Sequence, residues 1–240
     1  MITDQTEETR LARSRLFRFS VRRFLIALGL LLVATPFVED LKHGQTIETA
    51  LATLVILTGV FAAGAKRRTR ILAAILVVPA VVGNWANHFW PSHYRVELVF
   101  AARIVFLVFL VSHLLGFILR SRKVDSEVLC GALSVYLVLG LVWGIAYRLV
   151  ASITPDAFNF SVPTGASHAM NPFDAIYFSY ITLTTVGYGD ITPVSKVARM
   201  LAITEALTGT LFMAVLVARL VSLYSTPDPA ATAGKSRENT

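Results

Sequence analysis

The chain has 240 residues, of which 55% are hydrophobic, and its formal net charge is +7. The apolar share exceeds the roughly 45–50% that is usual for soluble domains. The basic residues border long apolar runs and do not form one basic patch, which argues against a nucleic acid as partner. The single cysteine, Cys130, excludes an intrachain disulfide. The composition therefore indicates a membrane protein.

Six apolar runs predict six transmembrane helices, because a helix needs about 20 residues to cross a bilayer. The runs are residues 24–38, 47–65, 71–90, 96–119, 128–150 and 197–224. The expected fold is an all-α membrane protein with six transmembrane helices.

Residues 1–23 form a basic N-terminal segment that contains six arginines. Apolar residues recur among these arginines at near-helical spacing. Two interpretations stay open. The segment is either an amphipathic helix that binds anionic lipids on the inner leaflet, or a solvated arm that serves as a topology signal.

The distribution of Lys and Arg predicts the orientation. With both termini in the cytoplasm, sixteen of these residues lie inside and five lie outside. The five outside are Lys42, Arg95, Arg148, Lys196 and Arg199. This asymmetry follows the positive-inside rule, so we expect a multi-pass protein of the plasma (inner) membrane.

The fourth run, residues 96–119, is where a voltage sensor would be expected. A sensor places arginine at every third position so that several charges cross the field together. This run holds Arg103 alone. Arg103 is therefore either a weak sensor charge or an interior polar contact, with Glu48 of the second run as the expected partner.

A short helix is predicted to begin at Asn171-Pro172-Phe173-Asp174, where a capping residue precedes proline and a first-turn carboxylate. From Pro172 to Thr184 it would rise about 20 Å, which is too short to cross a bilayer. The chain must then re-enter, and non-helical backbone at that depth has to be enclosed by protein. One such loop per chain predicts four chains around an axis.

The sequence Thr-Thr-Val-Gly-Tyr-Gly-Asp occupies residues 184–190, directly after this short helix. It resembles the selectivity filter of the tetrameric potassium channel family, with a six-span subunit of bacterial type that lacks the sensor repeat. The resemblance implies that the carbonyls of Thr185, Val186, Gly187 and Tyr188, with the Thr185 hydroxyl, hold K⁺. Gly187 and Gly189 would supply backbone conformations that are closed to most other residues.

The resemblance also implies roles for residues around the filter. Thr184, Asp190 and the aromatic pair Tyr177 and Phe178 would support it, with Tyr177 donating to Asp190. On the last run, Gly209 would act as a hinge or as a close helix contact. Val217 and Val221 would line the gate.

The expected domains are the basic segment 1–23, a four-helix sensor-like domain 24–123, a pore domain 124–224 and a polar cytoplasmic tail 225–240. The expected function is passive, K⁺-selective conduction through a homotetramer that is not steeply voltage-gated. The alternatives are weak voltage dependence or a subunit of a potassium uptake transporter. We expect no enzymatic activity, no cofactor beyond the conducted K⁺, and membrane lipids as partners. We expect no regulatory domain in this tail.

Overall fold

The structure is a computed structural model that describes residues 2–38, 41–62, 67–89, 96–121, 125–161 and 170–224. The predicted polar tail, residues 225–240, lies outside these residues. The elements in chain order are α1 (Ile2–Val38), α2 (Gly44–Ala62), α3 (Arg67–Phe89), α4 (Val96–Arg120), α5 (Ser126–Ile153), β1 (Phe158–Phe160), α6 (Pro172–Leu183), β2 (Ile191–Pro193) and α7 (Lys196–Tyr224).

Five helices of the described chain are long and apolar enough to cross a membrane: Ser20–Val38, Gly44–Ala62, Glu97–Arg120, Ser126–Ile153 and Lys196–Ser222. The predicted span at residues 71–90 corresponds to α3. Its apolar part, Ile71–Ala86, is shorter than the other five. All of α3 would rise about 35 Å at 1.5 Å per residue. The all-α membrane fold is confirmed, with the third predicted span as the one with the shortest apolar segment.

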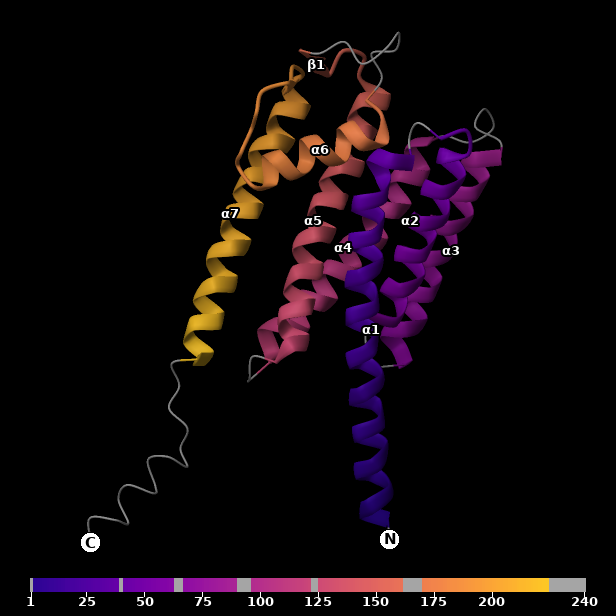
Figure 1. Cartoon of the computed structure of the whole chain (residues 1–240), viewed down its shortest axis with the longest axis vertical. Helices are drawn as coiled ribbons and strands as arrows, with labels where there is room; N and C mark the ends of the chain where they lie inside the picture. Colours follow the sequence, from indigo (N-terminus) through magenta and orange to yellow (C-terminus); the bar gives the residue numbers. More distant parts are fainter. Residues whose placement is uncertain are drawn as a thin grey trace, which may run out of the picture.

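Helices α1 to α4 form a bundle that packs against α5 (Figure 1). Apolar side chains from α1, α2 and α4 meet in its interior, where Phe24, Phe106 and Leu110 are fully buried. A Cβ atom at Gly59 of α2 would lie 2.9 Å from Leu110, so the absent side chain lets α2 approach α4 closely. In a membrane such close packing stabilises through van der Waals contact, because lipid tails are as apolar as these side chains.

The short helix α6 packs against both α5 and α7, and α7 lies on the opposite side of α5 from the bundle (Figure 1). A second buried cluster surrounds α6 and includes Tyr147, Phe158, Phe178 and Ile191. This cluster fixes α6 against the ends of α5 and α7.

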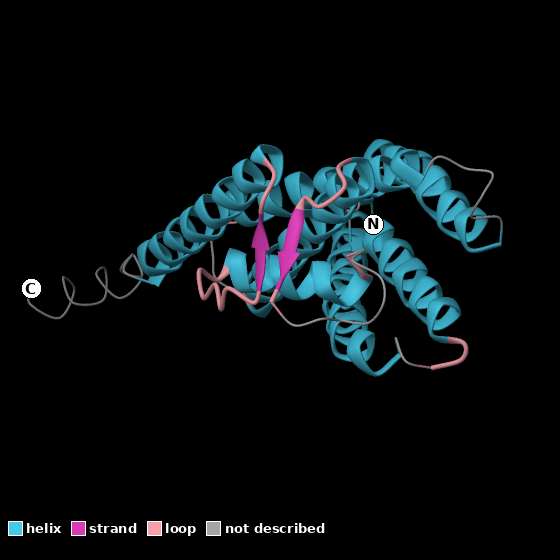
Figure 2. Cartoon of the chain, turned by 90° about the horizontal axis from the view of Figure 1, so that it is seen from above, coloured by secondary structure: helices cyan, strands magenta, loops and turns pink. Residues whose placement is uncertain are grey.

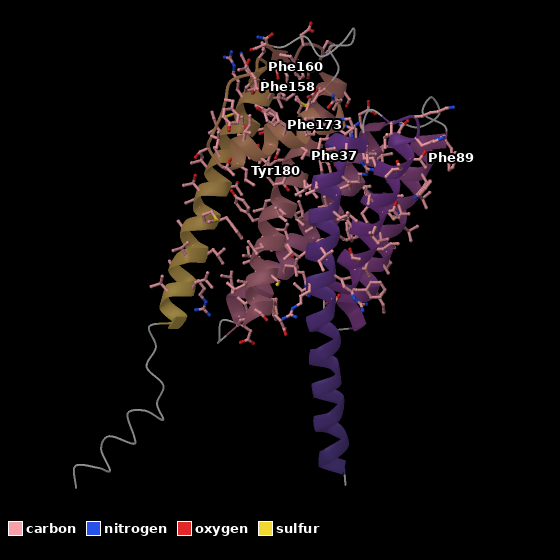
Figure 3. All side chains as sticks on the ribbon, in the orientation of Figure 1. Phe37, Phe89, Phe158, Phe160, Phe173 and Tyr180 are labelled. Carbon is pink, nitrogen blue, oxygen red and sulfur yellow. The ribbon has the colours of Figure 1, made fainter. Side chains whose placement is uncertain are left out.

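Strands β1 and β2 form an antiparallel ribbon that the sequence did not predict (Figure 2). Phe160 pairs with Ile191 and Phe158 pairs with Pro193. Three-residue strands carry little periodic signal of their own. The pairing depends on contact between segments some thirty residues apart in the chain. Phe158 and Phe160 lie at the end of the molecule that carries α6 (Figure 3).

Helix α1 runs without interruption from Ile2 to Val38. The backbone of the basic segment therefore continues into the first span and does not form a separate element. Gly29 is the first glycine or proline of this helix, so no residue of either type interrupts it before that point. The start of α1 and the end of α7 lie at the same end of the molecule, opposite α6 (Figure 1).

Candidate functional site: the pore loop and its supports

Helix α6 begins as the sequence predicts. The Asn171 side chain accepts a hydrogen bond of 2.6 Å from the backbone N–H of Asp174, and Pro172 occupies the first turn. The helix has 12 residues, about 18 Å at 1.5 Å per residue. It is therefore too short to cross a hydrocarbon core of about 30 Å.

The backbone of residues 184–190 alternates in an uncommon way. Thr185, Gly187 and Gly189 have φ values of 60°, 53° and 82°, so every second residue is left-handed. Glycine adopts this conformation freely, whereas in threonine it is uncommon and costs energy. A strained threonine between Thr184 and Val186 shows that the surrounding contacts determine the path of this segment.

The hydrogen bonds of the loop determine where its carbonyl groups point. The N–H of Val186 and the N–H of Gly187 both donate to the carbonyl of Ile181, at 2.9 Å and 3.1 Å. In a planar trans peptide the N–H and C=O groups point in opposite directions. The carbonyls of the preceding residues, Thr185 and Val186, are therefore both directed away from the end of α6.

The side of the loop away from α6 is open in the single chain. All residues from Thr184 to Gly189 are exposed, and Val186 and Tyr188 are 53% and 73% exposed. Backbone carbonyls directed toward this open side have few partners from their own chain. The arrangement can offer successive oxygens to a dehydrated cation.

Tyr177 and Asp190 are brought together across the loop. The Tyr177 hydroxyl donates a 2.6 Å hydrogen bond to the Asp190 carboxylate. This bond favours the protonated phenol and raises the pKa of Tyr177 to about 12. The Asp190 carbonyl in turn accepts a 2.8 Å bond from the N–H of Ser161, next to β1. The end of the loop is thus held by both α6 and the ribbon.

Phe178 lies in a different environment from Tyr177. It is 4% exposed, and its ring packs edge-to-face on Tyr147 and Phe158, with centroids 4.8 Å and 5.6 Å apart. The structure therefore brings Tyr177, and not Phe178, to Asp190. Phe178 contributes by anchoring α6 to α5 and β1.

Glu205 of α7 is fully buried behind α6. One of its carboxylate oxygens lies 2.5 Å from the Ser179 hydroxyl of α6, and the other accepts a short hydrogen bond from Tyr147 of α5. Ser179 also lies 2.7 Å from the carbonyl of Gly140. A carboxylate within an apolar run of the sequence predicts a functional site. The two partners of Glu205, however, come from two other helices, and no regular spacing in the sequence indicates them.

Two glycines of α5, Gly140 and Gly144, let α6 approach closely. A Cβ atom at Gly144 would lie 3.2 Å from the Ala175 carbonyl, and one at Gly140 would collide with the Tyr180 ring. Tyr180 reaches past this point and donates a 2.5 Å bond to the Leu137 carbonyl. The spacing Gly-x-x-x-Gly is a known signal for close packing of membrane helices, and it was missed in the sequence.

The three residues assigned to a hinge or gate have different surroundings. Gly209 is buried, and a Cβ atom there would collide with the carbonyl of Leu183 at the end of α6. This geometry favours a close helix contact at Gly209. Val217 and Val221 are 51% and 57% exposed, farther along α7.

Arg103 lines a cavity together with Glu48 and Arg148. Glu48, which the sequence suggested as its partner, attracts the Arg103 guanidinium, whereas Arg148 repels it. Besides Arg103, the charged residues of α4 are Glu97 and Arg120, near its ends. The arginine repeat of a voltage sensor is therefore missing from this helix.

In comparison with known protein families, the second half of the chain matches one family model. Residues 132–226 match a protein family model described as "Ion channel". This match begins within α5 and includes α6, the loop and α7.

Similar proteins include potassium channels. A 64-residue stretch is 41% identical to two pore potassium channel c of Oryza sativa subsp. japonica and covers 27% of this chain and 14% of that protein. An 81-residue stretch is 28% identical to the voltage-gated potassium channel of Aeropyrum pernix and covers 32% of this chain and 28% of that protein. A 48-residue stretch is 52% identical to protein LctB of Bacillus caldotenax and covers 20% of this chain and 35% of that protein.

These matches span about a third or less of each relative's length. The five apolar helices and the family match together show that the chain is an integral membrane protein. The match of residues 132–226 to the ion channel model and the similarity to potassium channels confirm the resemblance inferred from residues 184–190.

Proposed function

We propose that the chain forms a passive, K⁺-selective channel in which Thr185, Val186, Gly187 and Tyr188 coordinate the ion. The orientation of successive carbonyls carries the proposal. The N–H groups of Val186 and Gly187 bond to the end of α6, so the carbonyls of Thr185 and Val186 point together toward the open side. Such oxygens replace the hydration shell of a potassium ion.

We propose that four chains assemble around the pore. A single loop presents oxygens from one side only, whereas a dehydrated ion needs them on every side. The exposed face of α7 supports the assembly, because Leu207, Leu211 and Val215 are each more than half exposed there. In a tetramer these residues would contact neighbouring subunits or the inner pore.

We propose that the protein lies in the plasma membrane. Both of its termini would then be in the cytoplasm. The positive-inside asymmetry supports it. The start of α1 and the end of α7 lie at one end of the molecule, and α6 lies at the other (Figure 1). The loop would then face the outer side.

Ion flux into liposomes tests the function. Reconstituted chain should conduct K⁺ in preference to Na⁺, and Gly187→Ala should abolish this preference because φ at this position is 53°. Gly29→Ala is the matched control, since a Cβ atom there meets nothing within 4 Å. Equal permeation of both ions by the unaltered chain would reject the filter assignment.

Two further measurements separate the alternatives. One charge crossing 100 mV gains about 2.3 kcal/mol, against the 3–4 charges per subunit of a steep sensor. The proposed channel should therefore show a shallow conductance–voltage curve, and Arg103→Gln should flatten any residual slope. Flux that requires a second ion gradient would instead favour a subunit of an uptake transporter.

A further inference from the structure

A cavity of about 260 Å³ lies where the α1–α4 bundle meets α5 and the start of α6. Its polar lining comes from Thr35, Gln45, Glu48, Thr49, Asn84, Arg103 and Arg148. Pro172, the first residue of α6, also lines it. A water molecule needs about 10–15 Å³ of such volume, so the cavity has room for a much larger polar group.

The charge balance of this cavity is positive. Arg103 and Arg148 each contribute a guanidinium, and Glu48 is the one carboxylate among the lining residues. The two guanidinium groups repel each other, and Glu48 attracts that of Arg103. The positive end of the α6 dipole lies beside them at Pro172. An anion placed between the arginines would relieve the repulsion.

Two neutral polar side chains of the cavity, Asn84 and Thr49, are bonded to the protein. Asn84 donates to the Thr49 carbonyl at 3.2 Å, and the Thr49 hydroxyl donates to the Gln45 carbonyl at 2.7 Å. The Nε atom of Arg103, in contrast, is buried and has no hydrogen-bond partner among the described residues. A buried charged donor without an acceptor is costly, so this atom identifies where a ligand oxygen is needed.

An apolar pocket of about 80 Å³ continues from this cavity. The two share Glu48, Arg103, Arg148 and Pro172, so one boundary of the apolar pocket is charged. Its other lining residues include Leu31, Val55, Ile56, Phe106, Leu107 and Ile145. The pair of cavities is therefore amphipathic.

We propose that Arg103 and Arg148 bind the phosphate oxyanion of an amphiphile, an anionic lipid whose apolar part begins in the adjoining pocket. A guanidinium presents a planar fork that matches phosphate oxygens, which an ammonium group does not. Because α4, α5 and α6 all meet at the site, the bound lipid would join the peripheral bundle to the helix that carries the filter loop.

The test measures binding to the full chain in nanodiscs of phosphatidylcholine, with and without phosphatidylglycerol. Phosphatidylglycerol should raise the midpoint of thermal unfolding, since a ligand bound to the folded state stabilises it. Arg103→Gln and Arg148→Gln should each weaken this binding by about tenfold or more. Lys196→Gln is the matched control, because Lys196 is an exposed cation at the same end of the molecule, outside the cavity.

Two other variants separate a binding role from a structural one. Glu48→Gln removes the competing carboxylate and should tighten binding, which loss of structure would not do. Arg103→Lys keeps the charge without the fork, so it should restore only part of the affinity that Arg103→Gln loses.

A parallel titration with inorganic phosphate distinguishes the source of the oxyanion. Phosphatidylglycerol binding that free phosphate does not displace supports the lipid. Binding of phosphate alone, with no effect of phosphatidylglycerol, would support an oxyanion site but refute the proposal that its ligand is a lipid. Equal effects of Arg103→Gln and Lys196→Gln, or no ligand effect at all, would overturn the site.

Discussion

Replacing Glu205 tests whether α6 is held by hydrogen bonds or by charge. Glu205 connects Tyr147 of α5 and Ser179 of α6 to α7, and all three side chains are fully buried. In Glu205→Gln the amide oxygen can accept from Tyr147, and the amide N–H₂ can donate to Ser179. Ser179 can then donate to the Gly140 carbonyl, 2.7 Å away. The connection should therefore persist in this variant.

Glu205→Ala should be much more damaging. The Tyr147 hydroxyl would lose its acceptor, which costs about 1–3 kcal/mol for a buried group. Truncation of a fully buried side chain also leaves a void, and large-to-small changes in cores cost roughly 2–5 kcal/mol. Because these two costs fall on one side chain and are not additive, we expect a total loss of about 3–5 kcal/mol for Glu205→Ala, against about 1 kcal/mol or less for Glu205→Gln.

Tryptophan fluorescence during thermal unfolding measures the difference. Trp143 packs against the cluster around α6 and reports on this region. A loss of 3–5 kcal/mol corresponds to a midpoint roughly 6–20 °C lower for a chain of this size. Tyr147→Phe combined with Glu205→Gln should be non-additive, because the two side chains share one bond.

The reasoning fails if Glu205→Gln lowers the midpoint as much as Glu205→Ala does while Tyr147→Phe has no effect. That result would mean that the carboxylate acts through its charge. Current decay in the same variants gives an independent readout, because a loosened α6 should make the proposed filter inactivate faster.

Three other variants test the supports of the loop. Tyr177→Phe should speed current decay, because it removes the bond to Asp190; unchanged decay would argue against this support. The pKa of Tyr177 is raised from 10.0 to about 12, so the stabilisation should be complete below pH 10 and be lost as the pH rises through about 12. Current decay should accordingly show no step from this phenol between neutral pH and pH 10. Gly209→Val should push α7 away from the Leu183 carbonyl and reduce the yield of assembled protein, whereas Gly116→Val, where a Cβ atom meets nothing within 4 Å, should not. Gly144→Val should separate α5 from Ala175 of α6, with a similar loss of yield.

Features with a strong local signal could be predicted from the sequence. The long apolar runs were sufficient to predict the transmembrane helices, because crossing a bilayer requires only a certain length and an apolar composition. Asn171, Pro172 and Asp174 identified the start of α6, since cap chemistry is a local property. The bond from Tyr177 to Asp190 was expected from the resemblance, and the structure places these two side chains in contact.

Features that depend on contacts between distant segments were not predicted. The β1–β2 ribbon pairs residues some thirty positions apart, and each strand alone is three residues long. Glu205 stood out as a buried carboxylate, but Tyr147 and Ser179 lie 58 and 26 residues away from it in the chain. The cavity at Arg103 requires residues from α1 to α6, so it exists only in the folded chain.

The strained path of the loop has a consequence for how four chains would come together. The middle and the end of this segment are attached within one subunit: the N–H groups of Val186 and Gly187 to Ile181, and Asp190 to Tyr177 and Ser161. The conformational entropy lost in shaping this segment, about 1–2 kcal/mol per residue, is therefore lost when the monomer folds. Assembly would then align four segments that are already shaped, and its rate would depend on the encounter of subunits more than on reorganisation of the loop.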